Sequence, residues 1–248
     1  MTKQKKKPSW MYRIIKALVR FFYPKIHVSG EENLPDEAAL IVSNHAQMNG
    51  PIACELYFPG KHYTWCAGEM MHLKEVPKYA YADFWSGKPT LLRPFYKLLS
   101  YIIAPLSVCV FNNANTIGVY RDTRIISTFK NTVNRLSEGA NVVVFPEHDV
   151  PRNNIICEFQ DKFIDIARLY YRKTKKALSF VPMYLAPSLK TMYLGKPIQF
   201  DPESDIDAQR SRVAAYLMDA ITQIAQSLPE HTVVPYKNIP KKDYPKNI

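Results

Sequence analysis

The sequence predicts an α/β protein in which helices flank a central mixed sheet. Short apolar runs alternate along the chain with segments whose apolar residues recur every three or four positions, a pattern typical of strands alternating with helices. The 248 residues, 47% of them hydrophobic, suffice for one sizeable core. We therefore expect a basic arm over residues 1–25, one domain over residues 26–230 and a loose basic tail over residues 231–248.

The arm has the features of a membrane-surface helix. Residues 1–25 contain eight Lys or Arg and no acid, so they carry a charge of +8. Since the net charge of the whole chain is +11, the remaining residues carry only +3. Between Trp10 and Phe22, apolar side chains fall on one arc of a helix, and Arg13, Lys16 and Arg20 fall on the opposite arc. Such a helix suits the interface of an anionic membrane, whose lipids we expect as partners. A solvated basic leader followed by a core-packed helix is the alternative.

Six short runs rich in β-branched and aromatic residues are predicted strands. They cover residues 39–43, 62–67, 116–120, 141–145, 178–185 and 191–194. Predicted helices fill most of the gaps, over about 51–58, 124–136, 158–173 and 205–228. Pro51 suits the first turn of the first of them, and Gly139 ends the second.

No segment is expected to span a bilayer. The most apolar stretch, Leu98 to Phe111, has 14 residues and contains Pro105, whereas a spanning helix needs roughly 20 residues. We expect it to be buried or interfacial. No signal peptide is indicated, and the four scattered cysteines suggest neither disulfides nor a zinc site. The expected location is therefore cytoplasmic, peripheral to the inner face of the membrane.

His45 follows a predicted strand directly. Polar residues just past the carboxyl end of a strand in an α/β protein lie at the crevice where ligands bind. An imidazole there can take a proton from a hydroxyl that attacks an acyl carbon. A structural histidine is the alternative interpretation.

Three further strand ends carry motif residues of the same kind. Together with Asn44 and His45, they contribute Arg121, then Phe145, Pro146 and Glu147, then Val181 and Pro182. In order and spacing these four blocks resemble the glycerophospholipid acyltransferases, the 1-acylglycerol-3-phosphate acyltransferase (lysophospholipid acyltransferase) family. The resemblance extends from about Val28 to Pro202.

The resemblance implies a glycerolipid acyltransferase-like fold and an enzyme that moves a fatty acyl group to the hydroxyl of a lysophospholipid, by family default lysophosphatidate. The donor would be acyl-CoA or acyl carrier protein, the latter then being a partner. His45 would be the general base, and Glu147 would fix the acceptor or the catalytic loops. The implied substrate-binding residues are Asn44, Phe145, Pro146 and Arg121, the last gripping the acceptor phosphate. No cofactor and no metal are implied.

Two positions depart from the family pattern. The family's aspartate, five residues after the histidine, is Gly50 here, so the acid that orients the imidazole is missing. The family's Gly-Thr after Phe-Pro-Glu is His148-Asp149. Asn49, Glu147 or Asp149 are candidates to support His45 instead, with His148 and Pro182 as further auxiliary residues. We expect Gly50→Asp to leave the fold intact.

Other functional classes fit less well. The chain has no Gly-x-Ser-x-Gly elbow of a serine hydrolase, and its basic charge is a terminal arm rather than a nucleic-acid-binding surface. A metal hydrolase built on His45, His148 and Asp149 would match no known ligand spacing. The alternative to an enzyme is a catalytically inactive or divergent peripheral lipid-binding protein of the same fold.

Overall fold

The computed structural model describes residues 8–87 and 89–248 and groups the chain into two compact units. The first unit comprises the described parts of residues 1–24 and 65–128, and the second comprises residues 25–64 and 129–248. The expected domain over residues 26–230 thus draws on both units.

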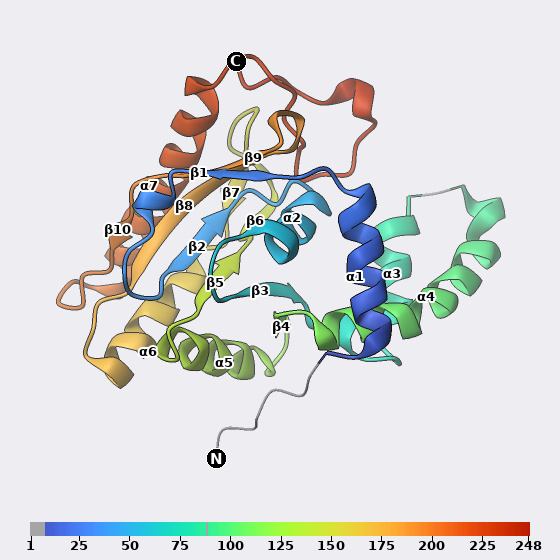
Figure 1. Ribbon diagram of the computed structural model, residues 1–248, viewed down its shortest axis with the longest axis horizontal. Helices are drawn as coiled ribbons and strands as arrows, with labels where there is room; N and C mark the ends of the chain where they lie inside the picture. Colours follow the sequence, from blue (N-terminus) through green and yellow to red (C-terminus); the bar gives the residue numbers. More distant parts are fainter. Residues whose placement is uncertain (1–7, 88) are drawn as a thin grey trace. The chain divides into compact units, whose positions relative to one another are not determined.

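The second unit is built around a mixed sheet (Figure 1). Its strand order is β1-β9-β8-β2-β5-β3, and β10 pairs with β8. Strands β8, β2, β5 and β3 run parallel, whereas β9 and β10 run antiparallel to β8. These strands are β1 (His27–Ser29), β2 (Leu40–Ser43), β3 (His62–Ala67), β5 (Asn141–Val144), β8 (Ser179–Ala186), β9 (Thr191–Leu194) and β10 (Ile198–Gln199). The predicted mixed sheet is confirmed.

The central strands are continuous apolar runs because both of their faces are covered. Every residue of β2 is buried, as are residues 142–144 of β5 and all but the first residue of β8. Parallel strands that are covered on both faces read in this way rather than as an alternating pattern. The shorter edge strands β1 and β10 lack such runs and are not among the six strands predicted from the apolar pattern, although β10 lies in the segment LGKPIQFDP, which resembles the closing strand of the acyltransferase family.

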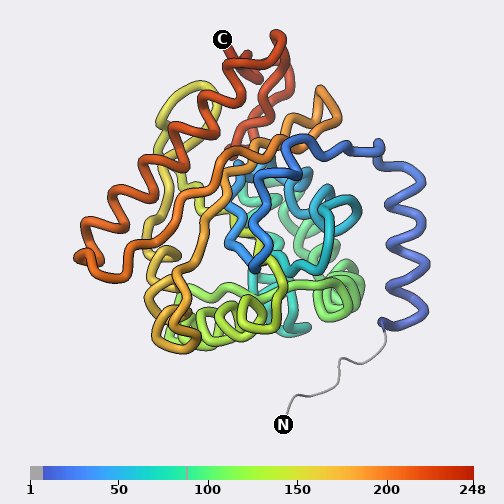
Figure 2. Tube along the Cα trace, turned by 60° about the vertical axis from the view of Figure 1, so that its left-hand side comes forward, coloured from blue at the N-terminus to red at the C-terminus, as the bar shows by residue number. Residues whose placement is uncertain are grey.

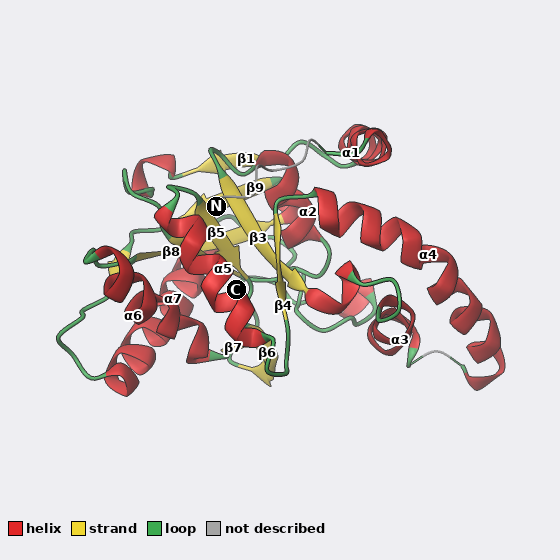
Figure 3. Ribbon diagram, turned by 90° about the horizontal axis from the view of Figure 1, so that it is seen from below, coloured by secondary structure: helices red, strands yellow, loops and turns green. Residues whose placement is uncertain are grey.

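Four helices accompany this sheet: α2 (Asn49–Tyr57), α5 (Ile125–Ser137), α6 (Asp165–Thr174) and α7 (Ile206–Ser227). The side chain of Asp205 caps α7, which packs on β8. Arg210 of α7 donates from Nε and Nη2 to the carboxylate of Asp165, at 2.8 and 2.7 Å, and so holds α6 and α7 side by side (Figure 3). The helix expected from residue 158 starts later, because β7 (Cys157–Phe159) pairs with β6 (Glu147–Pro151) as a two-stranded sheet.

The first unit contains the helices α1 (Trp10–Phe22), α3 (Val76–Ala80) and α4 (Arg93–Asn113), and the strand β4 (Thr116–Val119). The hydroxyl of Ser9 caps α1, and its backbone N–H donates to Asn113 Oδ1 at 2.8 Å. The amphipathic helix predicted for the arm is therefore present. Tyr12 is buried, but several large apolar side chains of the helix remain open to solvent, with Phe21 81% and Phe22 79% exposed. The basic residues Lys3, Lys5, Lys6 and Lys7 lie outside the described residues.

Helix α4 is longer than the sequence pattern suggested. It continues through Pro105, and together with the preceding turn it makes an apolar helical segment, Thr90–Asn113, that is long and apolar enough to cross a membrane by length and composition. Little of that segment is buried. The expectation that no segment has the length of a span is thus corrected, because an apolar helix need not stop at an internal proline.

The C-terminal residues are also packed, contrary to the expectation of a loose tail. His231, Val233 and Asn247 are all at least 95% buried. Asn247 Nδ2 donates to the carbonyl of Ala225 at 2.8 Å, so the end of the chain is fastened to the last turn of α7. In Figure 2 the red tube beyond α7 turns back toward that helix before it ends.

Candidate active site

The motif residues of two blocks meet because their strands are parallel neighbours. Val42 of β2 lies opposite Val144 of β5, so the residues that follow, from Asn44 and from Phe145, emerge at the same edge of the sheet. This edge is the carboxyl end of the parallel strands, where α/β proteins bind ligands. His45 lies here, as its position after an apolar strand predicted.

The imidazole of His45 is half-buried between aromatic rings. The ring centroids of His45 and Phe145 are 5.1 Å apart at an interplanar angle of 59°. Tyr236 presents its ring at 5.9 Å and 86°, an edge-to-face arrangement. These two contacts limit the orientations open to the imidazole while leaving it partly accessible.

Glu147 ties the two motif blocks together through backbone hydrogen bonds. Its buried carboxylate accepts the N–H of His45 at 2.5 Å and the N–H of Cys157 at 2.9 Å. Burial raises the pKa of Glu147 to about 7, although both N–H donors act to lower it. The carboxylate therefore holds the backbone at His45, rather than the imidazole ring, and it joins β7 to the same loop.

The side chain of Asn44 continues the hydrogen bonding between β2 and β8 past the end of β2. Its Oδ1 accepts the N–H of Leu185 at 2.7 Å, and its Nδ2 donates to the carbonyl of Leu185 at 3.1 Å. The side chain is buried and thus continues the pairing of β2 with β8 beyond the last strand residue. Pro146 and Pro182 are buried as well, and Pro182 lies opposite Val42 within the sheet.

The loop after His45 explains why residue 50 is a glycine. A Cβ on Gly50 would lie 2.5 Å from the carbonyl oxygen of His45 and 2.8 Å from the Phe145 ring. Real Cβ atoms do not approach a backbone oxygen so closely, so any side chain here forces the His45 backbone to move. The expectation that Gly50→Asp leaves the fold intact is corrected for this steric reason.

Two residues of this loop have strained backbone. Ala46 and Gln47 adopt φ angles of 46° and 55°, in the left-handed region that non-glycine residues rarely occupy. Each such residue costs on the order of 1 kcal/mol, and the strain persists only where neighbouring contacts hold it. The backbone at His45 is therefore fixed by its surroundings and not by its own preference.

The remaining auxiliary candidates lie around this loop. Asn49 Nδ2 donates to the carbonyl of Ala46 at 3.0 Å and so closes the turn that begins α2. His148 and Asp149 lie on β6, where Asp149 is exposed and, within the described part of the chain, makes no hydrogen bond or ion pair. Asp149 is therefore not positioned to orient His45 in this structure.

Arg121 belongs to the first unit and follows β4 there. It is exposed, and none of the residues described forms a hydrogen bond or ion pair with its guanidinium. Arg124, three residues later, differs. It donates to Glu75 and Asp122, and its guanidinium lies 4.1 Å from the centre of the Tyr120 ring.

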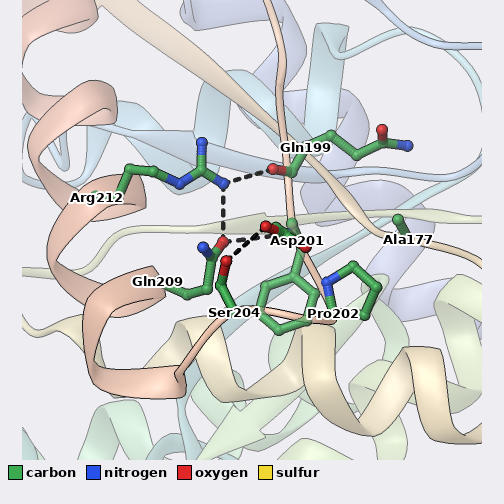
Figure 4. A pocket seen from close by; sticks show the side chains of 8 residues that line it. Ala177, Gln199, Asp201, Pro202, Ser204, Gln209 and Arg212 are labelled. Atoms are coloured by element: carbon green, nitrogen blue, oxygen red, sulfur yellow. Dashed lines mark hydrogen bonds between the residues drawn. The ribbon is translucent and has the colours of Figure 1, made fainter.

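A pocket of about 520 Å³ lies at the opposite end of the second unit's sheet (Figure 4). Gln199 on its wall pairs with Ser179 at the start of β8, whereas the last residue of β2 pairs with Met183 farther along. Arg212 donates from Nη2 to the Gln199 carbonyl and to Gln209 Oε1, both at 2.8 Å. The pocket contains none of the predicted site residues, and its polar groups satisfy one another.

Sequence reasoning missed two residues at the carboxyl end of the parallel strands, Tyr236 and Gln47. The amide of Gln47 donates to the carbonyl of Lys237 at 3.0 Å and accepts from the hydroxyl of Tyr244 at 3.2 Å. The aromatic and valine residues scattered among the prolines and lysines of the tail were a signal that this segment packs.

Within the described residues, no group of three or more His, Cys, Asp or Glu side chains is arranged to hold a metal ion. Fold and site together define an α/β protein with a half-buried histidine at the carboxyl end of a mixed sheet.

No protein-family model matches this chain, and no curated protein matches it. Among solved structures, the chain is similar to the crystal structure of the 1-acyl-sn-glycerophosphate (LPA) acyltransferase PlsC from Thermotoga maritima. The match has a TM-score of 0.48 and 14% sequence identity, and it covers 86% of this chain and 79% of that one. At this degree of similarity, the roles of individual residues must come from this chain itself.

Proposed function

We propose that this protein is an acyltransferase that moves a fatty acyl group from acyl-CoA or acyl carrier protein to the hydroxyl of a lysophospholipid. The observation that carries the proposal is the hydrogen bond from the His45 N–H to the Glu147 carboxylate. It joins the Asn-His and Phe-Pro-Glu blocks, whose resemblance to the acyltransferase family suggested the function, into one site around a half-buried imidazole.

In the proposed reaction His45 acts as the general base. It takes the proton of the acceptor hydroxyl while that oxygen attacks the thioester carbonyl carbon. The tetrahedral intermediate then collapses, the carbon–sulfur bond breaks, and the leaving thiolate takes the proton from the imidazolium. The proposed reaction needs no covalent enzyme intermediate and no cofactor. Glu147 contributes by holding the His45 backbone.

For the acceptor's phosphate we propose Arg121. Its guanidinium is exposed and makes no hydrogen bond or ion pair within the described chain, whereas Arg124 is engaged by Glu75 and Asp122. A guanidinium binds a phosphate with two parallel hydrogen bonds, which an ammonium cannot reproduce. Arg121→Ala should raise KM for the acceptor far more than KM for the donor, and Arg121→Lys should recover part of the loss. An equal effect on both substrates would speak against this role.

We further propose that the protein works at the cytoplasmic face of an anionic membrane, attached through the first unit. Helices α1 and α4 of that unit contact each other and both expose large apolar side chains, a surface that soluble monomers rarely present. The exposed residues include Trp10, Ile14, Leu18, Phe21 and Phe22 on α1, and Phe95, Leu98, Tyr101 and Ile102 on α4. Arg13, Lys16 and Arg20 add the cationic side that anionic lipids attract.

Vesicle flotation tests the membrane proposal. Replacing both Phe21 and Phe22 with Ser should weaken binding to anionic vesicles about tenfold or more, because each phenylalanine gains roughly 1.5–3 kcal/mol when it is buried in an apolar phase. High salt should weaken the wild type, and neutral vesicles should bind it less. Ile126→Ser, at another exposed apolar site, is the control. Undiminished binding by the double variant would refute the proposal.

The enzymatic proposal is tested by the release of free CoA from a long-chain acyl-CoA. With purified protein, release should require a lysophospholipid, and a screen of acceptors should identify the preferred head group. A parallel assay with acyl carrier protein distinguishes the two donors. Release that is independent of any acceptor would indicate a thioesterase instead.

A lipid-binding protein without catalytic activity is the second candidate, and Gly50 favours it. The position at which the family carries its orienting acid has no room for a side chain, since even a Cβ would meet the His45 carbonyl at 2.5 Å. Stoichiometric binding of lysophospholipid without acyl transfer from any donor would support this candidate.

A further inference from the structure

The last 21 residues fold back toward the loop that carries His45. Residues 231–247, here called the C-terminal strap, follow α7, bond to Gln47 of this loop and return to α7. Figures 1 and 2 show this segment in red beyond α7. The strap contains no motif of the acyltransferase resemblance.

Both ends of the strap are anchored in the core. The hydroxyl of Tyr184 on β8 and His231 Nε2 are 2.9 Å apart and hydrogen-bonded, and the N–H of His231 donates to Asn247 Oδ1 at 2.8 Å. The N–H of Val233 donates to the carbonyl of Pro245 at 2.9 Å, which closes the strap on itself. The segment between these anchors is therefore a held loop rather than a free end.

The middle of the strap contacts the His45 loop at three points. Tyr236 packs its ring against the imidazole at 5.9 Å. The carbonyl of Lys237 accepts from Gln47 Nε2 at 3.0 Å, and the hydroxyl of Tyr244 donates to Gln47 Oε1 at 3.2 Å. Gln47 is one of the two residues of this loop that have a left-handed backbone, so the strap contacts the loop at a strained residue.

An imidazole needs such support. The terminal torsion of a histidine side chain is broad and roughly two-fold, so its ring flips unless a partner fixes it. The acid that would otherwise do so has no space at position 50. Tyr236 and Phe145 enclose the ring from two elements, and the hydrogen bonds of the strap to Gln47 hold the loop that carries His45.

We propose that the C-terminal strap positions the His45 imidazole, with Tyr236 as the positioning residue. The expected change in kcat rests on the proposed acyl transfer, whereas the expected change in the position of the imidazole does not. The proposal predicts that removal of the Tyr236 ring, which packs edge-to-face on the imidazole, displaces the imidazole. The strap thereby does part of the work of the missing acid by packing.

The experiment compares Tyr236→Leu, Tyr236→Phe and Lys242→Ala in the full-length protein. Lys242 is an exposed strap residue without a hydrogen bond or ion pair in the described chain, so it serves as the control. Tyr236→Leu should lower kcat roughly 10- to 100-fold with little change in either KM, because misplacing a reacting group by about 1 Å costs that much. Tyr236→Phe should stay at least about tenfold above the leucine variant by the same reasoning.

A spectroscopic readout separates positioning from folding and from function. The chain has six histidines, and the ring-proton resonance of His45 is identified by its loss in His45→Gln. The ring protons of His45 should show nuclear Overhauser contacts to the Phe145 ring, whose centroid lies 5.1 Å from that of the imidazole. Tyr236→Leu should weaken these contacts and Lys242→Ala should keep them, whereas the loss of the Tyr236 ring current by itself leaves them in place. If Tyr236→Leu impairs folding, Tyr244→Phe, which removes only the donor to Gln47, should still weaken the contacts.

Undiminished contacts between the His45 and Phe145 rings in folded Tyr236→Leu, or wild-type kcat in that variant, would overturn the proposal. If the wild type transfers no acyl group to any acceptor, the proposed function fails. The ring contacts alone then decide: their loss in Tyr236→Leu supports positioning of the ring by the strap, and their persistence overturns it.

Discussion

The two ends of the second unit's sheet differ in how their polar side chains are held. At the amino end, Arg212, Gln209 and Asp201 surround an open pocket and bond chiefly to one another. At the carboxyl end, His45 is half-buried on a strained loop that Glu147 and the C-terminal strap hold in place. The pocket at the amino end is therefore a structural contact between polar groups, whereas the strained loop that Glu147 and the C-terminal strap hold is the site where chemistry is expected.

The largest loss of activity and stability in this comparison should come from adding a side chain at residue 50. Gly50→Ala places a Cβ against the His45 carbonyl and the Phe145 ring, so the His45 backbone must shift. We expect transfer to fall roughly 100-fold and stability to fall by about 1–3 kcal/mol. Kinetics and urea unfolding measure the two losses. The control is Gly87→Ala, at a site with open space around it, and equal behaviour of the two variants would contradict the steric account.

A smaller effect should follow from Glu147→Gln. An amide presents one acceptor and one donor to the N–H groups of His45 and Cys157, so one bond is lost and stability should fall by about 1–3 kcal/mol. Burial raises the pKa of Glu147 from 4.5 to about 7, so the carboxyl group binds its proton more tightly in the folded protein than in the unfolded chain. As the pH rises from about 4.5 to 7, the free energy of unfolding should therefore fall by on the order of 3 kcal/mol.

Urea unfolding across that pH range measures this contribution. Glu147→Gln should lose this part of the pH dependence, while Glu203→Gln, which changes an exposed carboxyl between β10 and α7, should keep it. The same pH dependence in the Glu147 variant and the wild type would show that Glu147 does not titrate in this range.

The smallest effect should be that of Arg212→Ala at the amino end. The variant removes hydrogen bonds to Gln199 and Gln209, which should cost about 1 kcal/mol of stability. The rate of acyl transfer should stay at the wild-type level. A loss of transfer without unfolding would reverse the comparison and make the amino-end pocket the functional site.

The sequence predicted what depends on local pattern. Apolar runs identified the buried strands, and a polar residue after such a run identified His45 at the edge of the sheet. Contacts between distant residues have no such signature. The pairing of Tyr236 with His45 joins positions far apart in the chain, and the polar composition of the tail concealed it. The space around Gly50 likewise depends on Phe145, which another strand delivers.

The central claim, that His45 is the base of an acyl transfer, is tested most directly by comparing wild type and His45→Ala in one assay. Both are given a long-chain acyl-CoA and the preferred lysophospholipid, and the acylated lipid is quantified. The account predicts transfer by the wild type and essentially none by a variant that remains folded, since the imidazole is the only group assigned to take the hydroxyl proton. Wild-type transfer by folded His45→Ala would contradict it.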